Sequence, residues 1–327
     1  MNRFGRQLLR TAVSAAYRPG GQARLPVLMY HRVLPQPDAL QPGLVDARQA
    51  DRQFKVLADL FHVMPLHDAA ELLRQGRLPR RALCITFDDG YRDNHDVALP
   101  LLKRHGITAT FYIASGFIDG GRMFNDSVME AVRHLPAGQF ELQSLGLPAF
   151  TISDTASRRA AVRDIVQAVK YMELGQRHAI CDELTRAAKV DLPNNLMMTS
   201  EQVAAMARQG MSIGGHTVRH PILQRVDDSA AREEIVANRI SLTSILGEAP
   251  RTFAYPNGKP GRDYSLSHAR MVREAGYDAA VSTAVGVGDR DADMFQLPRF
   301  VVTESTYPTI LFRLLRMSAV LTKDYSC

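Results

Sequence analysis

Two pairs of residues in this sequence have the side chains and the spacing needed for metal-assisted chemistry. Asp88 and Asp89 are adjacent carboxylates, and Gly90 after them permits a tight turn. His216 and His220 are four positions apart, so a helical turn or compact loop can present both imidazoles to one metal ion. Two histidines and one carboxylate leave coordination positions open, a composition typical of catalytic metal sites.

The two adjacent aspartates repel each other unless a cation or hydrogen-bond donors compensate their charge. They could therefore divide the work, one binding a metal and the other accepting a proton. Taken alone, each pair also has a simpler interpretation. Asp88-Asp89-Gly90 could be a turn with capping carboxylates, and the histidines could lie on a surface helix.

Each of these motifs follows an apolar segment that reads as a buried strand. Residues 82–87 lead to Asp88, and residues 211–216 lead to His216, with Gly214 and Gly215 leaving room for close backbone approach. A third strand, 252–256, contains Tyr255 and runs into Asn257, where a backbone amide could stabilise an oxyanion. Ligands of α/β folds collect at the carboxyl ends of the strands, so we expect the motifs to meet there.

The elements that must position these residues alternate between strand and helix, which predicts an α/β fold with a parallel sheet or barrel. A further stretch, 122–200, is helix-rich and charged and shows no clear strand pair, so we interpret it as an insertion. The expected strands are 25–31, 82–87, 109–114, 211–216, 252–256 and 279–283, and the expected helices are 48–62, 68–75, 94–105, 200–209, 228–246 and 265–275.

Composition excludes several other classes of protein. The chain has 327 residues with 46% hydrophobic and 23% charged, so it can bury a large core and is not a disordered protein. Its net charge of +6 would suit nucleic acid, an anionic membrane or an acidic polymer. Because no zinc-finger spacing, long basic run or aromatic–basic platform accompanies that charge, we do not expect nucleic-acid binding. The three cysteines, Cys84, Cys181 and Cys327, are too few and too widely spaced for a disulfide framework.

The two ends of the chain have amphipathic patterns. Leu8, Leu9 and Val13 alternate with arginines, and residues 310–317 have a similar pattern. Each segment could pack on the domain or lie on an anionic membrane surface. No long apolar stretch follows the first arginines, and none approaches a membrane span, so we expect neither a secretory signal nor a transmembrane helix.

Together and in this order, the motifs resemble those of the polysaccharide deacetylases of the NodB-homology type, the fourth carbohydrate esterase family. That family's first motif, T-F-D-D-G, is matched in full by 86–90, and its second, H-[ST]-x-x-H, by His216, Thr217 and His220. The resemblance covers roughly 25–118 and 200–303. It implies a distorted (β/α) barrel of about seven strands that removes acetyl groups from N-acetylated oligo- or polysaccharides.

Carried over residue by residue, the resemblance implies that Asp88 is the general base and that Asp89, His216 and His220 bind a divalent metal. Zn²⁺ suits this ligand set best, with Co²⁺, Mn²⁺ or Ni²⁺ as alternatives. Thr217 would support the second-motif loop through hydrogen bonds.

The sequence departs from the family pattern after the second motif. Ala254 stands where the third motif commonly has an arginine, the chain has no Trp, and Arg299 occupies the position of the fifth-motif histidine. The opening strand ends at His31, as in the exopolysaccharide-type, PgaB-like branch that the sequence resembles. We therefore predict that His31 is the general acid and that Arg299 replaces the missing arginine beside Asp88. Asn257, Tyr255 and Arg299 are the candidates for oxyanion or substrate contacts.

From these features we predict an amphipathic extension at 1–24, a deacetylase domain at 25–303 with a helical insertion at about 122–200, and a C-terminal helix within 304–327. The expected function is deacetylation during exopolysaccharide synthesis, by a cytoplasmic enzyme in peripheral contact with the inner membrane. Two alternatives stay open. One is a non-catalytic glycan-binding or membrane-associated assembly protein on this fold. The other is a deacetylase acting on peptidoglycan or chitin.

Overall fold

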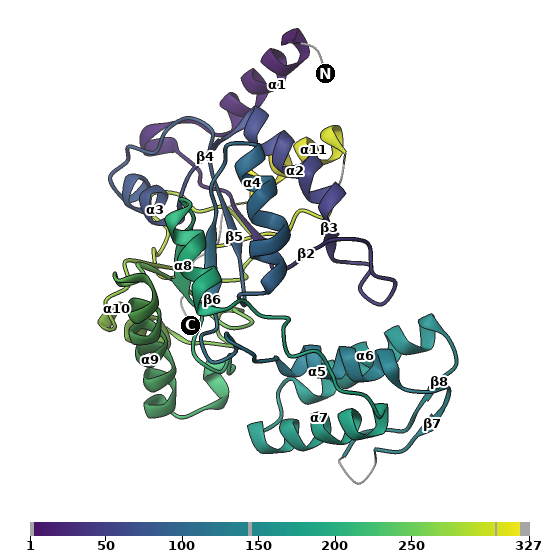
Figure 1. The fold of residues 1–327 in the computed structure, drawn as a ribbon. Coiled ribbons are helices and arrows are strands. Elements are labelled where there is room, and N and C mark those ends of the chain that lie inside the picture. The colour runs from purple at the N-terminus through teal and green to yellow at the C-terminus, as the bar shows by residue number, and fades with distance from the viewer. Residues whose placement is uncertain (1–2, 143–145, 305, 321–327) are drawn as a thin grey trace.

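The protein is described from a computed structural model that covers residues 3–142, 146–304 and 306–320 (Figure 1). Its centre is a seven-stranded parallel sheet in the order β1-β5-β6-β9-β10-β11, with β4 paired to β5 outside this path. The strands are β1 Val27–Tyr30, β4 His62–Val63, β5 Ala82–Phe87, β6 Thr110–Ile113, β9 Ser212–Gly215, β10 Thr252–Ala254 and β11 Ala279–Val281. The sheet curls into the distorted (β/α) barrel that the resemblance implied, and the predicted fold class is confirmed.

A short segment near the end of the chain links the two edges of this curled sheet. Leu297 makes a parallel bridge to Val281 of β11, and Phe300 makes one to Leu28 of β1. Four backbone hydrogen bonds hold the segment, two to each edge, with N···O distances of 2.8–3.1 Å. Arg299 lies between these anchor points, so its position is fixed by both edges of the sheet.

Helices cover the outside of the sheet (Figure 1). They are α2 Ala47–Leu60, α3 Leu66–Arg74, α4 Leu99–Arg104, α8 Ser200–Arg208, α9 Asp228–Leu246 and α10 Leu266–Glu274, with a π-helical turn at Asn94–Ala98 and 3-10 turns at Gly20–Gln22 and Leu223–Arg225. Polar caps set several of their starts. Asp46 accepts from the backbone amide of Gln49 at the start of α2, and Thr199 from that of Gln202 at α8. A two-stranded parallel pair, β2 Val33–Leu34 with β3 Val45–Asp46, precedes α2.

Residues 124–188 form a separate group beside the barrel, at the lower right of Figure 1. Its elements are α5 Phe124–His134, β7 Gly138–Phe140, β8 Phe150–Ile152, α6 Thr155–Val169 and α7 Leu174–Ala188. They enclose an apolar core of their own, which includes Val132, Ile165 and Ile180. The expectation that this stretch contains no strand pair is wrong, because β7 and β8 pair antiparallel. Strands of three residues are too short to show an alternating pattern in the sequence.

The two terminal helices pack against α2, at the end of the molecule farthest from this group (Figure 1). In α1, Arg3–Ala16, Val13 is buried, and the Tyr17 hydroxyl just after the helix donates to the carbonyl of Leu314 in α11, Tyr307–Met317, at 2.5 Å. Each helix also keeps one large apolar side chain in solvent, Leu8 at 56% and Phe312 at 70% exposure. No helix in the described part of the chain has the length and apolar character needed to cross a membrane. Cys327 lies outside the described residues.

Candidate active site

Asp88 follows β5 and is paired with Arg299 in a buried, two-pronged contact. Nη1 of Arg299 donates to Oδ1 of Asp88 at 2.6 Å, and Nη2 donates to Oδ2 at 2.8 Å. Arg299 also donates from Nε to the carbonyl of Ser282 and from Nη1 to the Thr86 hydroxyl. The guanidinium is thereby fixed in one orientation, and it fixes the carboxylate in turn. The predicted placement of Arg299 beside Asp88 is confirmed, whereas the prediction that Arg299 contacts the oxyanion or substrate is wrong, because its side chain is buried and does not line the cavity described below.

Asp89, His216 and His220 bring three potential metal-ligand atoms together. The Nε2 atoms of His216 and His220 each lie 3.4 Å from Oδ1 of Asp89. All three donor atoms lie within 4.8 Å of one another. Ligands about 2.1 Å from a tetrahedrally coordinated zinc ion are about 3.4 Å apart, so the spacing fits a bound divalent metal.

The proton on His216 is also placed for metal binding. Nδ1 of His216 lies 2.7 Å from the carbonyl oxygen of Ala254. Because a carbonyl can only accept, Nδ1 carries the hydrogen, and Nε2 directs its lone pair toward Asp89 and His220. A carbonyl partner of this kind is a usual support for a metal-binding histidine.

The loop that carries the two histidines adopts a strained backbone, which its own hydrogen bonds maintain. Thr217 and His220 have φ angles of 63° and 54°, in a region that a β-branched residue such as threonine rarely adopts. The Thr217 hydroxyl accepts from the amide of His220 at 3.1 Å, which confirms its predicted supporting role. Glu234 of α9 accepts from the amides of Val218 and Arg219, each at 2.8 Å.

The glycines before this loop are required by close packing. A Cβ atom on Gly214 would lie 2.5 Å from the ring of Tyr112, and one on Gly215 would clash with the Tyr277 hydroxyl. The sequence expectation that these glycines permit close approach is therefore confirmed, and the approaching groups are aromatic side chains.

Electrostatics keep both aspartates ionised. Burial alone would raise the pKa of Asp88, but the Arg299 guanidinium and the nearby imidazole of His216 hold it below its ordinary value. Burial acts on Asp89 in the same way, and there the two histidines lower the pKa. Burial lowers the pKa of His220 to about 3, because the neutral imidazole is favoured away from water. A neutral imidazole is the form that binds a metal.

These residues line a cavity of about 190 Å³, which also receives His31 and Asn257. His31 is exposed at the end of β1, and its carbonyl accepts from the Asn94 side chain at 2.9 Å. Asn257 has a φ of 59°, and its carbonyl accepts from the Thr283 hydroxyl at 2.7 Å. Within the described part of the chain, its amide N–H has no acceptor and is free to donate to a ligand.

The structure does not bring Tyr255 to this cavity. Its side chain is buried and stacks on Tyr264, with ring centroids 3.8 Å apart, and its hydroxyl donates to the carbonyl of Phe295 at 2.9 Å. The prediction of a substrate contact through this side chain is therefore wrong. The adjacent strand residue, Ala254, points its carbonyl at His216, so this strand end positions a ligand instead.

One wall of the cavity was not predicted. It comes from the 124–188 group, which contributes Phe124, Asn125, Val166 and Lys170. Asn125 donates to the Tyr91 hydroxyl at 3.1 Å, and that hydroxyl reaches the buried carboxylate of Asp126. The residues come from two helices whose faces toward the barrel depend on tertiary packing. Among these residues only Asn125, next to Asp126, offers a signal in the sequence, and a helix cap is the more usual explanation of such a pair.

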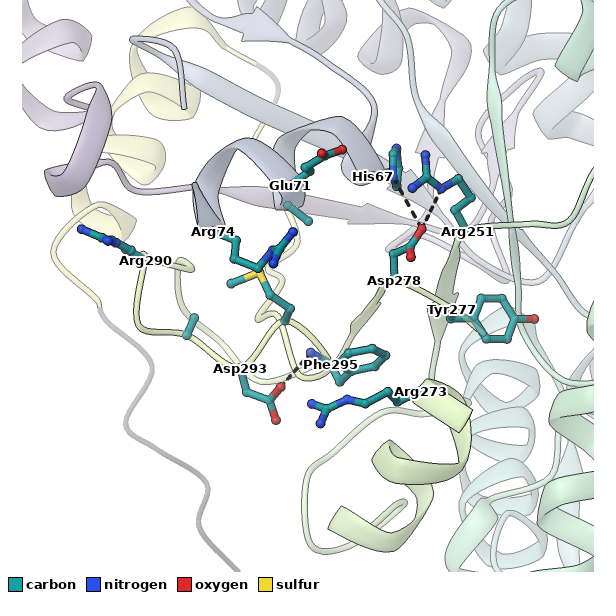
Figure 2. A pocket seen from close by; sticks show the side chains of 13 residues that line it. His67, Glu71, Arg74, Arg251, Arg273, Tyr277, Asp278, Arg290, Asp293 and Phe295 are labelled. Carbon is teal, nitrogen blue, oxygen red and sulfur yellow. Dashed lines mark hydrogen bonds and ion pairs between the residues drawn. The ribbon is translucent and has the colours of Figure 1, made fainter. Parts of the chain in front are cut away.

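A larger cavity, of about 560 Å³, lies at the opposite rim of the sheet (Figure 2). Arg251 and Asp278 line it and immediately precede β10 and β11, where they form an ion pair of 2.6 Å. None of the predicted site residues reaches this cavity. The predicted catalytic residues therefore lie in the smaller of the two cavities.

Comparison with known proteins agrees with this geometry. Residues 75–280 match the family model described as polysaccharide deacetylase. The Bacillus subtilis protein YxkH, whose name assigns it to the polysaccharide deacetylases, is 22% identical over 283 residues, which cover 86% of this chain and 72% of that protein.

Several solved structures share the fold, PplD and IcaB among them. The deacetylase PplD of Streptococcus pyogenes, solved with acetate, superposes with a TM-score of 0.61 at 18% identity, over 89% of this chain and 98% of that one. IcaB from Ammonifex degensii gives a TM-score of 0.57 at 20% identity, over 91% and 98%. The chain belongs to the polysaccharide deacetylase family, and it is a hydrolase of that class.

Proposed function

We propose that the protein is a metal-dependent enzyme that hydrolyses N-acetyl groups of an N-acetylated polysaccharide during exopolysaccharide synthesis. The observation that carries the proposal is a carboxylate held by Arg299 beside the Asp89–His216–His220 cluster, in one cavity. A protein that only bound glycans would not need a buried, ionised aspartate next to a metal site. The intact set therefore favours catalysis over the non-catalytic alternative.

Asp89, His216 and His220 would hold the metal, with Zn²⁺ the best match to one carboxylate and two imidazoles. When bound there, a divalent metal supplies Lewis acidity toward the acetyl carbonyl and lowers the pKa of nearby water. The residues fit this role because all three side chains are largely buried and His216 has its Nδ1 hydrogen already engaged.

Asp88 would be the general base. Its two oxygens accept from Arg299, and each keeps a lone pair for the proton of the attacking water. Arg299 prevents the carboxylate from turning and keeps it ionised in a buried site. Arg299 would thus take over the positioning role of the arginine that the family's third motif commonly supplies.

His31 would protonate the departing sugar amine, and the Asn257 amide would donate to the oxyanion. His31 lines the same cavity as Asp88 while remaining open to solvent, so it can exchange protons with water. The Asn257 N–H is unused by the described residues and lies in the loop that follows β10. Both assignments agree with the departures from the family pattern.

The experiment that tests the proposed function is acetate release from defined N-acetylglucosamine oligomers, with the metal content of the same sample measured. We expect release that a chelator abolishes and Zn²⁺ restores. Chitin and peptidoglycan fragments serve as comparison substrates. Absence of acetate release from every N-acetylated oligosaccharide, in protein carrying one metal per chain, would contradict the proposal.

We further propose that the end of the molecule formed by α1 and α11 rests on an anionic membrane surface. Leu8 and Phe312 are exposed on helices that both pack on α2, and Arg316 is exposed on α11. Apolar side chains beside arginines suit the headgroup boundary of anionic lipid. Flotation with phosphatidylglycerol vesicles should recover the protein, whereas phosphatidylcholine vesicles or a Leu8→Gln/Phe312→Gln variant should not.

The prediction of a cytoplasmic enzyme on the inner membrane has its own test. Fractionation of cells that express the chain from its natural gene should place it with the cytoplasmic and inner-membrane fractions. Recovery outside the inner membrane would overturn that prediction while leaving the proposed chemistry in place.

A further inference from the structure

Four basic side chains gather beside the wall of the active-site cavity that contains Lys170, and we call them the basic rim: Lys170, Arg225, Lys259 and Arg262. Three of them gather around one aromatic ring. The charged groups of Arg262, Arg225 and Lys170 lie 4.7, 5.5 and 5.7 Å from the ring centre of Tyr171. They come from three separate segments, so the fold assembles a cluster that no sequence run shows.

The basic rim lacks matching negative charge. Asp263 is the carboxylate in contact with it, and its oxygens already accept from the Tyr171 hydroxyl at 3.3 Å and from the Lys259 amide at 3.0 Å. Four cations and one carboxylate leave a net charge of 4 − 1 = +3. None of the four cations forms an ion pair with another described residue.

Other arginines of the barrel, unlike the cations of the basic rim, each have a carboxylate partner. Arg32 is paired with Asp93, Arg219 with Glu234 and Arg299 with Asp88. Those arginines hold the fold or the catalytic carboxylate. Lys170 is instead half-buried near other cations. Burial lowers its pKa, Asp263 opposes the change, and Lys259 and Arg262 add to it. Cations that repel one another in the free protein are stabilised when an anion binds.

The basic rim is continuous with the site of reaction. Lys170 itself lines the cavity together with Asp88 and His216. Arg225 follows the loop that carries His220, and Lys259 follows Asn257 in the loop after β10. The cavity, at about 190 Å³, is smaller than the ~300 Å³ of a typical ligand site, so it suits one acetylated sugar. Neighbouring sugars of a polymer that leave the cavity on the Lys170 side would then lie over the basic rim.

We propose that the natural substrate is an anionic glycan, with a carboxylate or phosphate on a sugar next to the N-acetylated unit, and that the basic rim binds this group. The inference rests on the proposed deacetylase function and specifies its substrate class. Guanidinium groups suit either anion, because both present paired oxygens to their N–H donors. Arg225 and Arg262 lie against Tyr171 and are exposed, so their remaining donors face solvent.

The test compares three substrates with the zinc-loaded full-length chain. The first is neutral N-acetylglucosamine tetramer, the second an oligosaccharide of alternating glucuronate and N-acetylglucosamine, and the third an oligomer of N-acetylglucosamine linked by phosphodiesters. We expect kcat/KM to be at least about tenfold higher for one of the anionic substrates at low ionic strength, and this preference to shrink in 0.5 M NaCl. The second and third substrates distinguish a carboxylate from a phosphate.

The variant Arg225→Gln/Arg262→Gln removes two charges of the basic rim. We expect the anionic preference to fall about three- to tenfold, mainly through KM, because each exposed charge contributes modestly. Arg208→Gln is the matched control, since Arg208 is exposed at the end of α8, before the amino end of β9, and is not among the residues that line the cavity. Its preference should equal that of the unaltered chain.

Direct binding separates this inference from the proposed function. Calorimetric titration of the same oligosaccharides measures affinity without turnover, and the anionic ones should bind more tightly in a salt-dependent way. Turnover of the neutral tetramer with no anionic preference in kcat/KM or affinity would overturn the inference and leave the deacetylase intact. Tighter anionic binding without acetate release would support the basic rim and contradict the deacetylase.

Discussion

Arg299 donates one hydrogen bond to each carboxylate oxygen of Asp88, although the two residues are 211 positions apart in the sequence. The contact exists because the segment around Arg299 lies between β11 and β1 and joins the edges of the curled sheet. The proposed base is thus held by the element that closes the barrel. A substitution in the segment around Arg299 can therefore change the reaction rate without removing any contact to the substrate.

Replacing Arg299 by lysine tests this positioning role. Arg299→Lys keeps the positive charge but loses the two-pronged geometry, so Asp88 can turn. Loss of one charged hydrogen bond, worth about 1.5–3 kcal/mol, should lower kcat about ten- to hundredfold. Steady-state acetate release measures the change, and metal content should stay at the unaltered level. Unchanged turnover would show that Arg299 only stabilises the fold.

Asp88→Asn removes the proposed base and keeps its shape. General-base catalysis typically contributes 10²–10⁴-fold, so kcat should fall by about that factor. Metal content measured by mass spectrometry should be unchanged, because Asp88 is not among the proposed ligands. The variant leaves the Arg299 guanidinium without its carboxylate partner, which can destabilise the fold. The melting temperature of the variant therefore has to be measured as well. Substantial activity in a folded, metal-loaded variant would refute the role.

His31→Gln distinguishes an acid from a residue that only lines the cavity. Removal of a sugar amine needs protonation, whereas release of 4-nitrophenolate from its acetate ester does not. We expect deacetylation of the oligosaccharide to fall about a hundredfold and hydrolysis of the ester to remain nearly unchanged. His178→Gln, on an exposed position of α7, is the control. Equal loss on both substrates would point to a role other than proton donation.

Metal binding should stabilise the folded chain as well as activate it. At a free metal concentration about a thousand times Kd, a ligand adds ~4 kcal/mol to the free energy of unfolding. Thermal unfolding with Zn²⁺ and with chelator should show this difference. Asp88→Asn should retain it, and His216→Ala should lose it. A shift that survives His216→Ala would place the metal elsewhere.

Asp126 makes stability depend on pH. Burial is the main cause that raises its pKa to about 7, and the nearby negative charge of Asp89 adds to this effect. The folded state therefore holds a proton that the unfolded state has released, and stability falls as pH rises from about 4 to about 7, by up to ~4 kcal/mol. Asp126→Asn cannot ionise, so its stability relative to the unaltered chain should increase across that range. Urea unfolding at pH 5 and pH 8 measures the free energy of unfolding of both proteins. The same pH dependence in both would disprove the raised pKa of Asp126.

The fold and the central site could be predicted because their signals are local. Apolar runs that end in Asp88 or His216 specify both a buried strand and the functional side chain at its carboxyl end, and helical periodicity located α2 and α9 to within two residues. The position of Arg299 was predicted only because Ala254 stands where the family's third motif commonly has an arginine. The cavity wall from the 124–188 group and the basic rim could not be predicted. Only tertiary packing brings Lys170 and Arg262 together at Tyr171.

The 124–188 group encloses its own apolar core yet reaches the reaction centre through a few side chains of α5 and α6. This wall of the cavity is therefore encoded apart from the strands that carry Asp88 and His216, whereas Arg225, Lys259 and Arg262 of the basic rim lie in loops of the barrel. Substitutions in the cavity wall formed by α5 and α6 leave the strands that carry Asp88 and His216 unchanged. Exchanging residues 122–200 between relatives would therefore change this wall and Lys170 while keeping the strands of the reaction centre and the three barrel residues of the basic rim.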